Sequence, residues 1–288
     1  MIGRAPHHLI RMETAAPQAP PNPPELPEGA NTAPPWPAWY AVAGFVVAAV
    51  AILIVVGILA AATGTTSDNQ SSTFSIVATL LQEAILIGTA AVFASFTAPP
   101  RPWHFGLRST RFWPAVGWAA LGLFSFYVFA AVYSIVVEPT AKQNITQSLG
   151  ADQGTLRLIL AGLMVIAVAP VAEEFFFRGF FYRALRGRFP VVVAALIDGV
   201  VFGLIHYDSG LLLILPPLAV LGFVLCLVYE QTGSIFPTIA IHALNNTVAY
   251  GVQAHAWSVS LVLGPLVIGG CMLAPRVIRP LRAAPALR

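Results

Sequence analysis

The chain has 288 residues, of which 57% are hydrophobic and 9% charged, and its mean hydropathy is +0.78. A soluble domain carries roughly 25% charged residues, so the composition excludes an ordinary soluble protein and predicts an integral membrane protein with the lipid bilayer as its surroundings. The net charge of +3 comes from basic residues placed between apolar runs rather than on one basic face, so we expect no nucleic-acid partner.

The chain begins with a segment that differs from the rest in composition. Residues 1–36 are rich in proline and contain no apolar run, which predicts a disordered tail outside the membrane. We expect one transmembrane helical domain over residues 37–275 and a basic C-terminal tail over residues 276–288. No second domain and no internal repeat is apparent.

Apolar runs of about twenty residues recur along the middle of the chain, the length that crosses the hydrocarbon core as a helix. They lack the short alternating pattern of a membrane barrel. The predicted fold is therefore all-α, a polytopic transmembrane helical bundle of about eight spans. The expected spans cover residues 37–62, 74–97, 113–137, 157–178, 190–206, 211–230, 235–251 and 257–275.

The basic residues between these spans predict an orientation. Three arginines follow the second expected span, three lie between the fourth and fifth, and four follow the last. By the positive-inside bias, this distribution places both termini in the cytoplasm. The Pro-rich and Ala-rich composition suggests a bacterium, so we expect the bacterial cell membrane.

The stretch over residues 170–188, PVAEEFFFRGFFYRALRGR, places two adjacent acids and an arginine in an aromatic run. A charged side chain at the centre of a membrane helix costs about 2.5–3.5 kcal/mol on the insertion scale. Glu174 and Arg178 are spaced i, i+4 with the acid first, the better order for an ion pair. Glu173 then lacks a local cation and is free to act as a general base. A structural ion-pair network of all three residues is the alternative.

Two intramembrane histidines extend this constellation. His206 follows Phe202 by four residues at the end of the fifth span, and His242 precedes Asn246 by four in the seventh. If a hairpin turns near Phe189, Glu173 and His206 lie at the same depth, roughly 24 Å from the turn. His242 lies only about 10–12 Å from the same side. Either the Arg-rich hairpin tip projects beyond the bilayer, or the sixth span is broken at its two prolines.

Four further ionisable residues, two acids and two cysteines, lie inside the expected spans. Glu83 and Asp198 could support the central site, although a hydrogen bond between helices or a pair with an arginine explains each equally well. Cys226 and Cys271 fall in apolar runs, where a thiol behaves as a small hydrophobic group.

The ordered motifs EExxxR, FxxxH and HxxxN resemble those of the CAAX-protease and bacteriocin-processing family of intramembrane proteases, which includes the Ras-converting CAAX endopeptidase. The resemblance covers about residues 113–251. It implies an intramembrane endopeptidase in which Glu173 activates the hydrolytic water, Glu174 and Arg178 hold its surroundings, and His206 with Asn246 stabilises the oxyanion. His242 is then a second histidine of the site.

Two versions of this chemistry are compatible with the sequence. In one, no cofactor is needed. In the other, Glu173, His206 and His242 hold a divalent metal such as zinc with an open position for water. The chain lacks the HExxH pair that places two zinc ligands on one helix, so such a metal would be assembled from three spans.

The expected substrate is a membrane-associated protein or peptide. The resemblance implies a lipidated CAAX protein, but a bacterium is not expected to contain prenylated CAAX substrates, so another peptide or membrane protein is an equal alternative. Two non-enzymatic functions are alternatives. One is a catalytically inactive scaffold or immunity-type protein, and the other is a transporter-like protein coupled to an ion or proton. Against transport, no inverted repeat is found.

Overall fold

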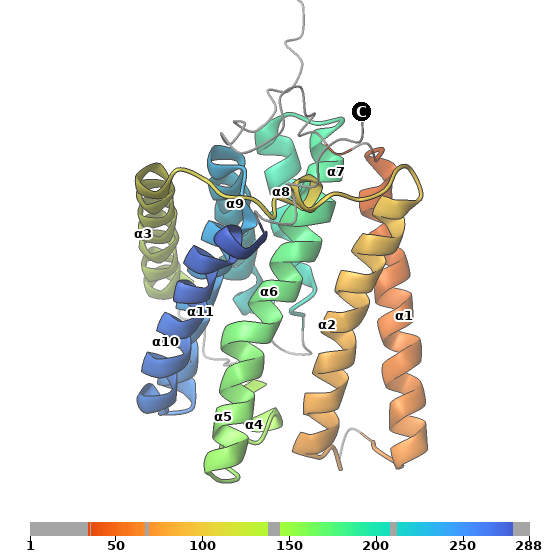
Figure 1. Ribbon diagram of the computed structural model, residues 1–288. Helices are drawn as coiled ribbons and strands as arrows, with labels where there is room; N and C mark the ends of the chain where they lie inside the picture. Colours follow the sequence, from red (N-terminus) through yellow and green to blue (C-terminus); the bar gives the residue numbers. More distant parts are fainter. Residues whose placement is uncertain (1–33, 35, 67–68, 138–144, 208–211, 279–288) are drawn as a thin grey trace, which may run out of the picture.

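A computed structural model describes the chain except for residues 1–33, 35, 67–68, 138–144, 208–211 and 279–288. The described residues form helices and no strand, as expected for an all-α protein (Figure 1). The expected N-terminal tail lies almost entirely outside the described residues, and the C-terminal tail does so from residue 279 onward.

The helices follow one another along the chain with short connections. In chain order they are α1 (Trp39–Thr63), α2 (Ser72–Ser95), the 3₁₀ turn η1 (Pro102–Phe105), α3 (Phe112–Val137), α4 (Ile145–Ser148), α5 (Thr155–Leu163), the π-helix η2 (Met164–Val168), α6 (Ala169–Glu174), the π-helix η3 (Phe175–Tyr182), α7 (Arg183–Arg186), α8 (Val191–Leu204), the 3₁₀ turn η4 (Leu212–Ile214), α9 (Leu215–Thr232), α10 (Ile235–Gln253) and α11 (Trp257–Ile278).

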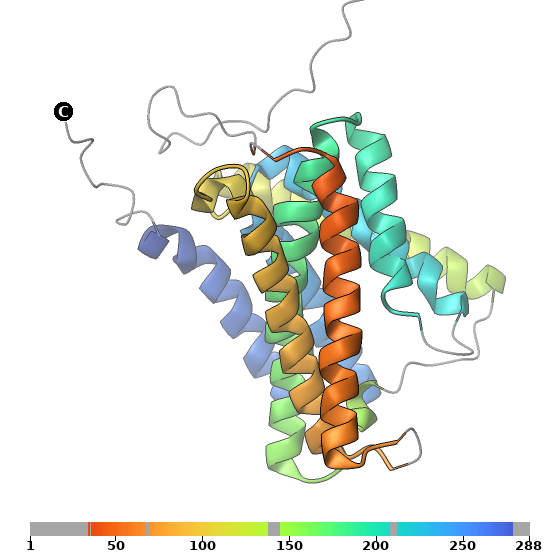
Figure 2. The same cartoon turned by 90° about the vertical axis from the view of Figure 1, so that its right-hand side faces the viewer.

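Each of the eight expected spans corresponds to a helical segment. Six of these segments are long and apolar enough to cross a membrane, α8 is a shorter apolar helix, and α10 is not among either group. The segment from α5 to α7 is continuous over Thr155–Arg186, and we call it the central helix. It contacts α2, α8 and α10, which pack around it (Figures 1 and 2).

The length of the central helix bears on the mismatch in depth that the sequence implied. Its 32 residues correspond to about 48 Å of helix, longer than the roughly 30 Å hydrocarbon core, as a projecting Arg-rich tip requires. Pro216 and Pro217 lie in the first turn of α9, directly after the 3₁₀ turn η4, so the sixth expected span changes its helix type beside these prolines. Both expected explanations stay predictions.

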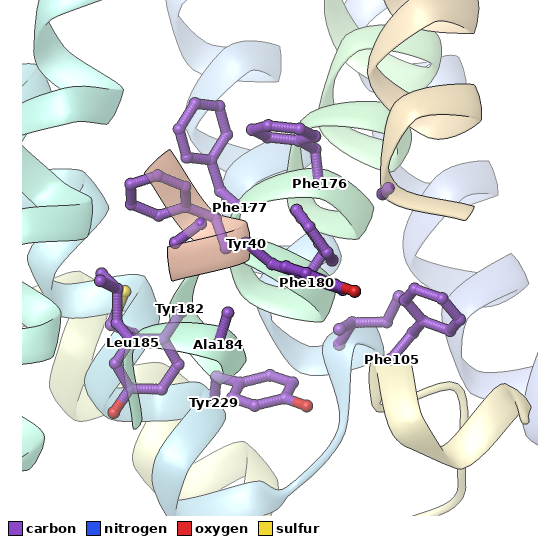
Figure 3. Packing of buried hydrophobic residues seen from close by; sticks show 14 of the residues in the cluster. Tyr40, Phe105, Phe176, Phe177, Phe180, Tyr182, Ala184, Leu185 and Tyr229 are labelled. Carbon is purple, nitrogen blue, oxygen red and sulfur yellow. The ribbon is translucent and has the colours of Figure 1, made fainter. Parts of the chain in front are cut away.

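An aromatic core surrounds the upper half of the central helix. The rings of Phe176, Phe177 and Phe180 on η3 are fully buried, and Figure 3 shows them grouped near Tyr40. Phe105 from η1 stacks on Phe175 at a centroid distance of 4.6 Å. This packing fixes the rotation of the central helix, and therefore the directions in which its charged residues point.

Two glycines on α8 allow that helix to approach α9 closely. A Cβ atom at Gly199 would lie 2.5 Å from the Ala219 carbonyl oxygen, and one at Gly203 would lie 3.0 Å from the Ala219 Cβ. The four-residue spacing of small residues is typical of close helix contacts in membranes. The close approach also places Gly222 of α9 beside α8, where its carbonyl oxygen reaches the charged cluster described next.

Candidate active site

The predicted pair between Glu174 and Arg178 is confirmed. The Arg178 Nη1 atom donates to Glu174 Oε1 at 2.9 Å, and both side chains are fully buried. Arg178 Nη2 donates to the Gly222 carbonyl oxygen at 2.9 Å and lies 3.7 Å from Asp198 Oδ1. The Cys226 thiol donates to the same Asp198 oxygen at 3.1 Å. Arg178 therefore joins two acids from different helices.

His242 contacts both adjacent acids of the central helix. Its Nδ1 atom lies 3.0 Å from Glu174 Oε1, and its Nε2 atom lies 3.9 Å from Glu173 Oε2. A carboxylate oxygen accepts, so in the ionised state of Glu174 the hydrogen lies on Nδ1 of His242. The other nitrogen, Nε2, then faces Glu173.

The two acids differ in access and in their hydrogen bonds. Glu174 is fully buried and accepts from Arg178 and His242, whereas Glu173 keeps 6% of its surface exposed. One oxygen of each acid, Glu173 Oε2 and Glu174 Oε2, is buried and has no hydrogen-bond partner among the described residues. The two acids therefore differ in that Glu173 keeps some exposed surface, whereas Glu174 is enclosed and bound by its neighbours.

The ring of Phe202 contacts the charged cluster and both histidines. The Arg178 guanidinium carbon is 4.5 Å from the centre of this ring, a cation–π distance. The ring centroids of His206 and His242 lie 5.0 Å and 5.6 Å from that of Phe202. The Phe residue of the FxxxH motif therefore packs against both imidazoles and against the arginine of the EExxxR motif.

His206 follows the last residue of α8, Leu204, and is half-buried. Its Nδ1 atom lies 2.8 Å from the Phe202 carbonyl oxygen. A carbonyl can only accept, so Nδ1 carries the hydrogen and Nε2 of a neutral His206 presents a lone pair. The expectation of a neutral donor at His206 therefore needs correction: donation from Nε2 requires the imidazolium form.

Asn246 binds a backbone carbonyl of the central helix. The Ala169 amide donates to the Met164 carbonyl, which is π-helical spacing, and the next amide in that register would belong to Pro170. Proline has no amide hydrogen, so the Val165 carbonyl loses that helical donor. Asn246 Nδ2 donates to this carbonyl oxygen at 2.9 Å. The sequence contained one signal of this contact, a proline three residues before the acid pair. It could not show which side chain donates to the freed carbonyl, because that depends on the tertiary fold.

The two other intramembrane acids differ in their roles. Asp198 lies beside an arginine, Arg178, the structural alternative considered for it. Glu83 of α2 is 3% exposed, and its carboxyl group is close enough to Glu173 for the two like charges to interact. Of these two acids, Glu83 is the one that lies next to the accessible carboxylate.

The zinc alternative finds no support in the geometry. No group of three His, Cys, Asp or Glu side chains within the described part of the chain is arranged to hold a metal ion. His242 Nε2 lies 3.9 Å from Glu173 Oε2, but no third side chain among the described residues joins this pair to complete a ligand set. The expected ligand set of Glu173, His206 and His242 therefore does not fit a zinc site in this arrangement.

Comparison with known proteins identifies one segment of the chain. Residues 155–248 match the family described as Type II CAAX prenyl endopeptidase Rce1-like. Residues 155–248 are similar to this family, and we call them the Rce1-like segment. The chain is also similar to Putative membrane peptidase YdiL of Bacillus subtilis (strain 168), with 34% identity over 88 residues. No match to a solved structure was found.

The similarity to the Bacillus protein covers 30% of this chain and 35% of that relative, so the chain matches about a third of the curated relative. The Rce1-like segment runs from the start of the central helix into α10. It contains the six expected site residues, which are Glu173, Glu174, Arg178, His206, His242 and Asn246. Glu83, on α2, lies outside it.

Proposed function

We propose that the protein is an intramembrane endopeptidase that hydrolyses a peptide bond of a membrane-associated protein or peptide. The observation that carries the proposal is the position of His242, whose two ring nitrogens face the two adjacent acids of the central helix. Support also comes from the Rce1-like segment, which contains this arrangement. The protein is an integral membrane protein, so the bond it cleaves lies within or near the bilayer.

In the proposed reaction, Glu173 is the general base. It takes a proton from a water molecule, whose oxygen attacks the scissile carbonyl carbon while the carbonyl electron pair moves to oxygen. When the tetrahedral intermediate collapses, the C–N bond breaks and the proton passes from Glu173 to the leaving nitrogen. In this reaction water enters through the exposed part of Glu173, and His242 Nε2, 3.9 Å from Glu173 Oε2, lies beside it.

Glu174 and Arg178 are positioning residues in this proposal. Glu174 accepts from Nδ1 of His242 and so orients Nε2 towards Glu173. Arg178 holds Glu174 by an ion pair that water does not reach. Because neither side chain is exposed, neither is available to touch the substrate.

His206 and Asn246 are the proposed donors to the oxyanion. His206 donates from Nε2 when it is an imidazolium, since Nδ1 is engaged with the Phe202 carbonyl. Asn246 has a second hydrogen on Nδ2 beyond the one given to Val165. Two such donors aimed at the developing negative charge lower the barrier to attack.

The proposal is tested with the full chain purified in detergent and returned to vesicles. Wild type and the variant Glu173→Gln are compared on two peptides, a membrane-embedded reporter and a prenylated CAAX peptide. Glu230→Gln is the matched control. Glu230 of α9 pairs at 2.8 Å with Arg186, which lies in the hairpin tip and not beside the two acids. We expect cleavage of at least one peptide by wild type and by Glu230→Gln, and at least a hundredfold loss in Glu173→Gln.

Two results would contradict the proposal. Equal turnover by wild type and Glu173→Gln would remove Glu173 as the base. Absence of cleavage on both peptides and on a wider panel would favour a scaffold protein. Cleavage of only the prenylated peptide would assign the substrate class that the family description names.

We also propose that both termini face the cytoplasm. The described basic residues outside the site lie mostly at the end shared by the η1 connection and the α7–α8 tip, at the top of Figure 1. Arg157, at the start of α5, lies at the opposite end. Labelling of single cysteines introduced at residues 188 and 157 by an impermeant reagent tests this orientation, and labelling of residue 188 from outside intact cells would overturn it.

A further inference from the structure

An apolar cavity of about 610 Å³ lies between α3, α10 and α11. Its walls are mainly aliphatic, with Val116 and Leu123 from α3, Leu244 from α10 and Ile268 from α11. Figure 1 shows α3 standing to one side of α10 and α11. The cavity therefore opens between helices whose outer faces are in lipid.

The length of the cavity corresponds to one leaflet of a bilayer. On α3 its lining runs from residue 112 to residue 123, which is about 16 Å of helix, and the hydrocarbon core of both leaflets is about 30 Å thick. An occupant that enters from the headgroup level thus reaches roughly the bilayer centre. That is the dimension of a single lipid chain.

The headgroup end of the cavity is polar and positive. Ser109, Thr110 and Arg276 line it there. The Arg276 side chain is exposed and has no hydrogen bond or ion pair with another residue that the structure describes, and the exposed Arg111 follows Thr110 directly. The sequence continues beyond α11 with three more arginines, and clusters of four or more basic residues next to a span are typical of binding to anionic lipids.

The cavity lies on the side of α10 away from the candidate active site. Pro237, Ile241 and Leu244 line it, whereas His242 and Asn246 bind the central helix. At about 100° per residue, the two sets lie on roughly opposite faces of α10. No residue of the central helix or α8 lines the cavity, so a peptide seated at the acids would not fill it.

We propose that this cavity is a binding site for an anionic phospholipid, whose phosphate contacts Arg276 and whose acyl chain lies between α3, α10 and α11. The lipid covers the apolar faces that α3 and α11 turn toward the cavity, and α10 forms the wall between these two helices. This inference does not depend on the proposed peptidase activity.

The test is native mass spectrometry of the full chain released from vesicles that contain equal amounts of phosphatidylglycerol and phosphatidylcholine. We expect one phosphatidylglycerol retained per protein after detergent exchange. Arg276→Glu removes the phosphate contact, and Ala120→Phe places a ring in the cavity. Each should lower retention at least tenfold. The matched controls are Arg188→Glu, an exposed arginine on the hairpin tip, and Ala62→Phe, on the exposed end of α1, and both should retain lipid as wild type does.

Three outcomes would overturn the proposal. Equal retention by all variants would mean that the lipid is bound nonspecifically around the helices. Equal retention of the zwitterionic lipid would remove the role of Arg276. Displacement of the lipid by a prenylated peptide at stoichiometric concentration would assign the cavity to the substrate instead. Near-ultraviolet circular dichroism of each variant in the same detergent checks that it is folded.

Discussion

Replacement of the two adjacent acids by alanine separates their roles through stability. Glu174→Ala leaves the Arg178 guanidinium in a buried site without its closest carboxylate. Removal of one partner from a buried ion pair costs about 3–5 kcal/mol. Arg178 keeps the Gly222 carbonyl and the more distant Asp198, at 3.7 Å, so we expect a loss near the lower end, about 3 kcal/mol.

Glu173→Ala is the matched comparison because the two acids are adjacent on the same helix. The Glu173 Oε2 atom has no hydrogen-bond partner among the described residues, and it lies 3.9 Å from His242 Nε2. Truncation therefore strands no cation, and we expect a change in the free energy of unfolding of at most about 1 kcal/mol. Activity should nevertheless be lost, because the general base is missing.

The measurement is unfolding of both variants in one detergent, followed by circular dichroism as a function of denaturant. Glu174→Gln adds an intermediate case, since its amide oxygen still accepts from Arg178 but carries no charge. We expect Glu173→Ala to be the most stable of the three variants, Glu174→Gln to be less stable and Glu174→Ala to be the least stable. A large loss for Glu173→Ala with none for Glu174→Ala would reverse the assignment of the two acids.

Two further predictions concern the surroundings of this pair, and a third concerns η1. Asn246→Ala leaves a part-buried carbonyl of the central helix without its donor, which costs about 1 kcal/mol, whereas Asn245→Ala should cost less in the same unfolding assay. Phe202→Leu removes the ring that packs against both imidazoles and should lower kcat at least tenfold while the protein remains folded by circular dichroism. Burial and the nearby Arg183 lower the pKa of His104 to about 4. Because the unfolded histidine binds a proton below about pH 6.5, stability should decline from pH 6.5 to 4, and His104→Gln should flatten the decline of the unfolding midpoint.

The fold and the central ion pair could be predicted because they depend on short-range rules. Apolar length accounts for six of the expected spans and for the shorter helix α8. The hairpin near Phe189 and the turn at Gly233 and Ser234 are where the sequence placed them. The Glu174–Arg178 pair follows from helical periodicity alone. None of these required knowledge of which helices are neighbours.

The contacts of the remaining site residues could not be derived in this way. The role of Asn246 depends on a change of hydrogen-bond register before Pro170, which periodicity does not reveal. The partner of His206 is its own helix, at the Phe202 carbonyl, rather than an acid across the hairpin. Spacing gave the depth of these groups, but side-chain rotamers decide which atoms they face.

The combination of these features gives the site one rigid side and one accessible side. Arg178 has Glu174, Asp198 and the Phe202 ring around it, and all of them are fully buried. Glu173 lies on the same helix and is the acid of the two that keeps some exposed surface. Glu174, which is held by Arg178, binds one ring nitrogen of His242, and the other ring nitrogen faces Glu173.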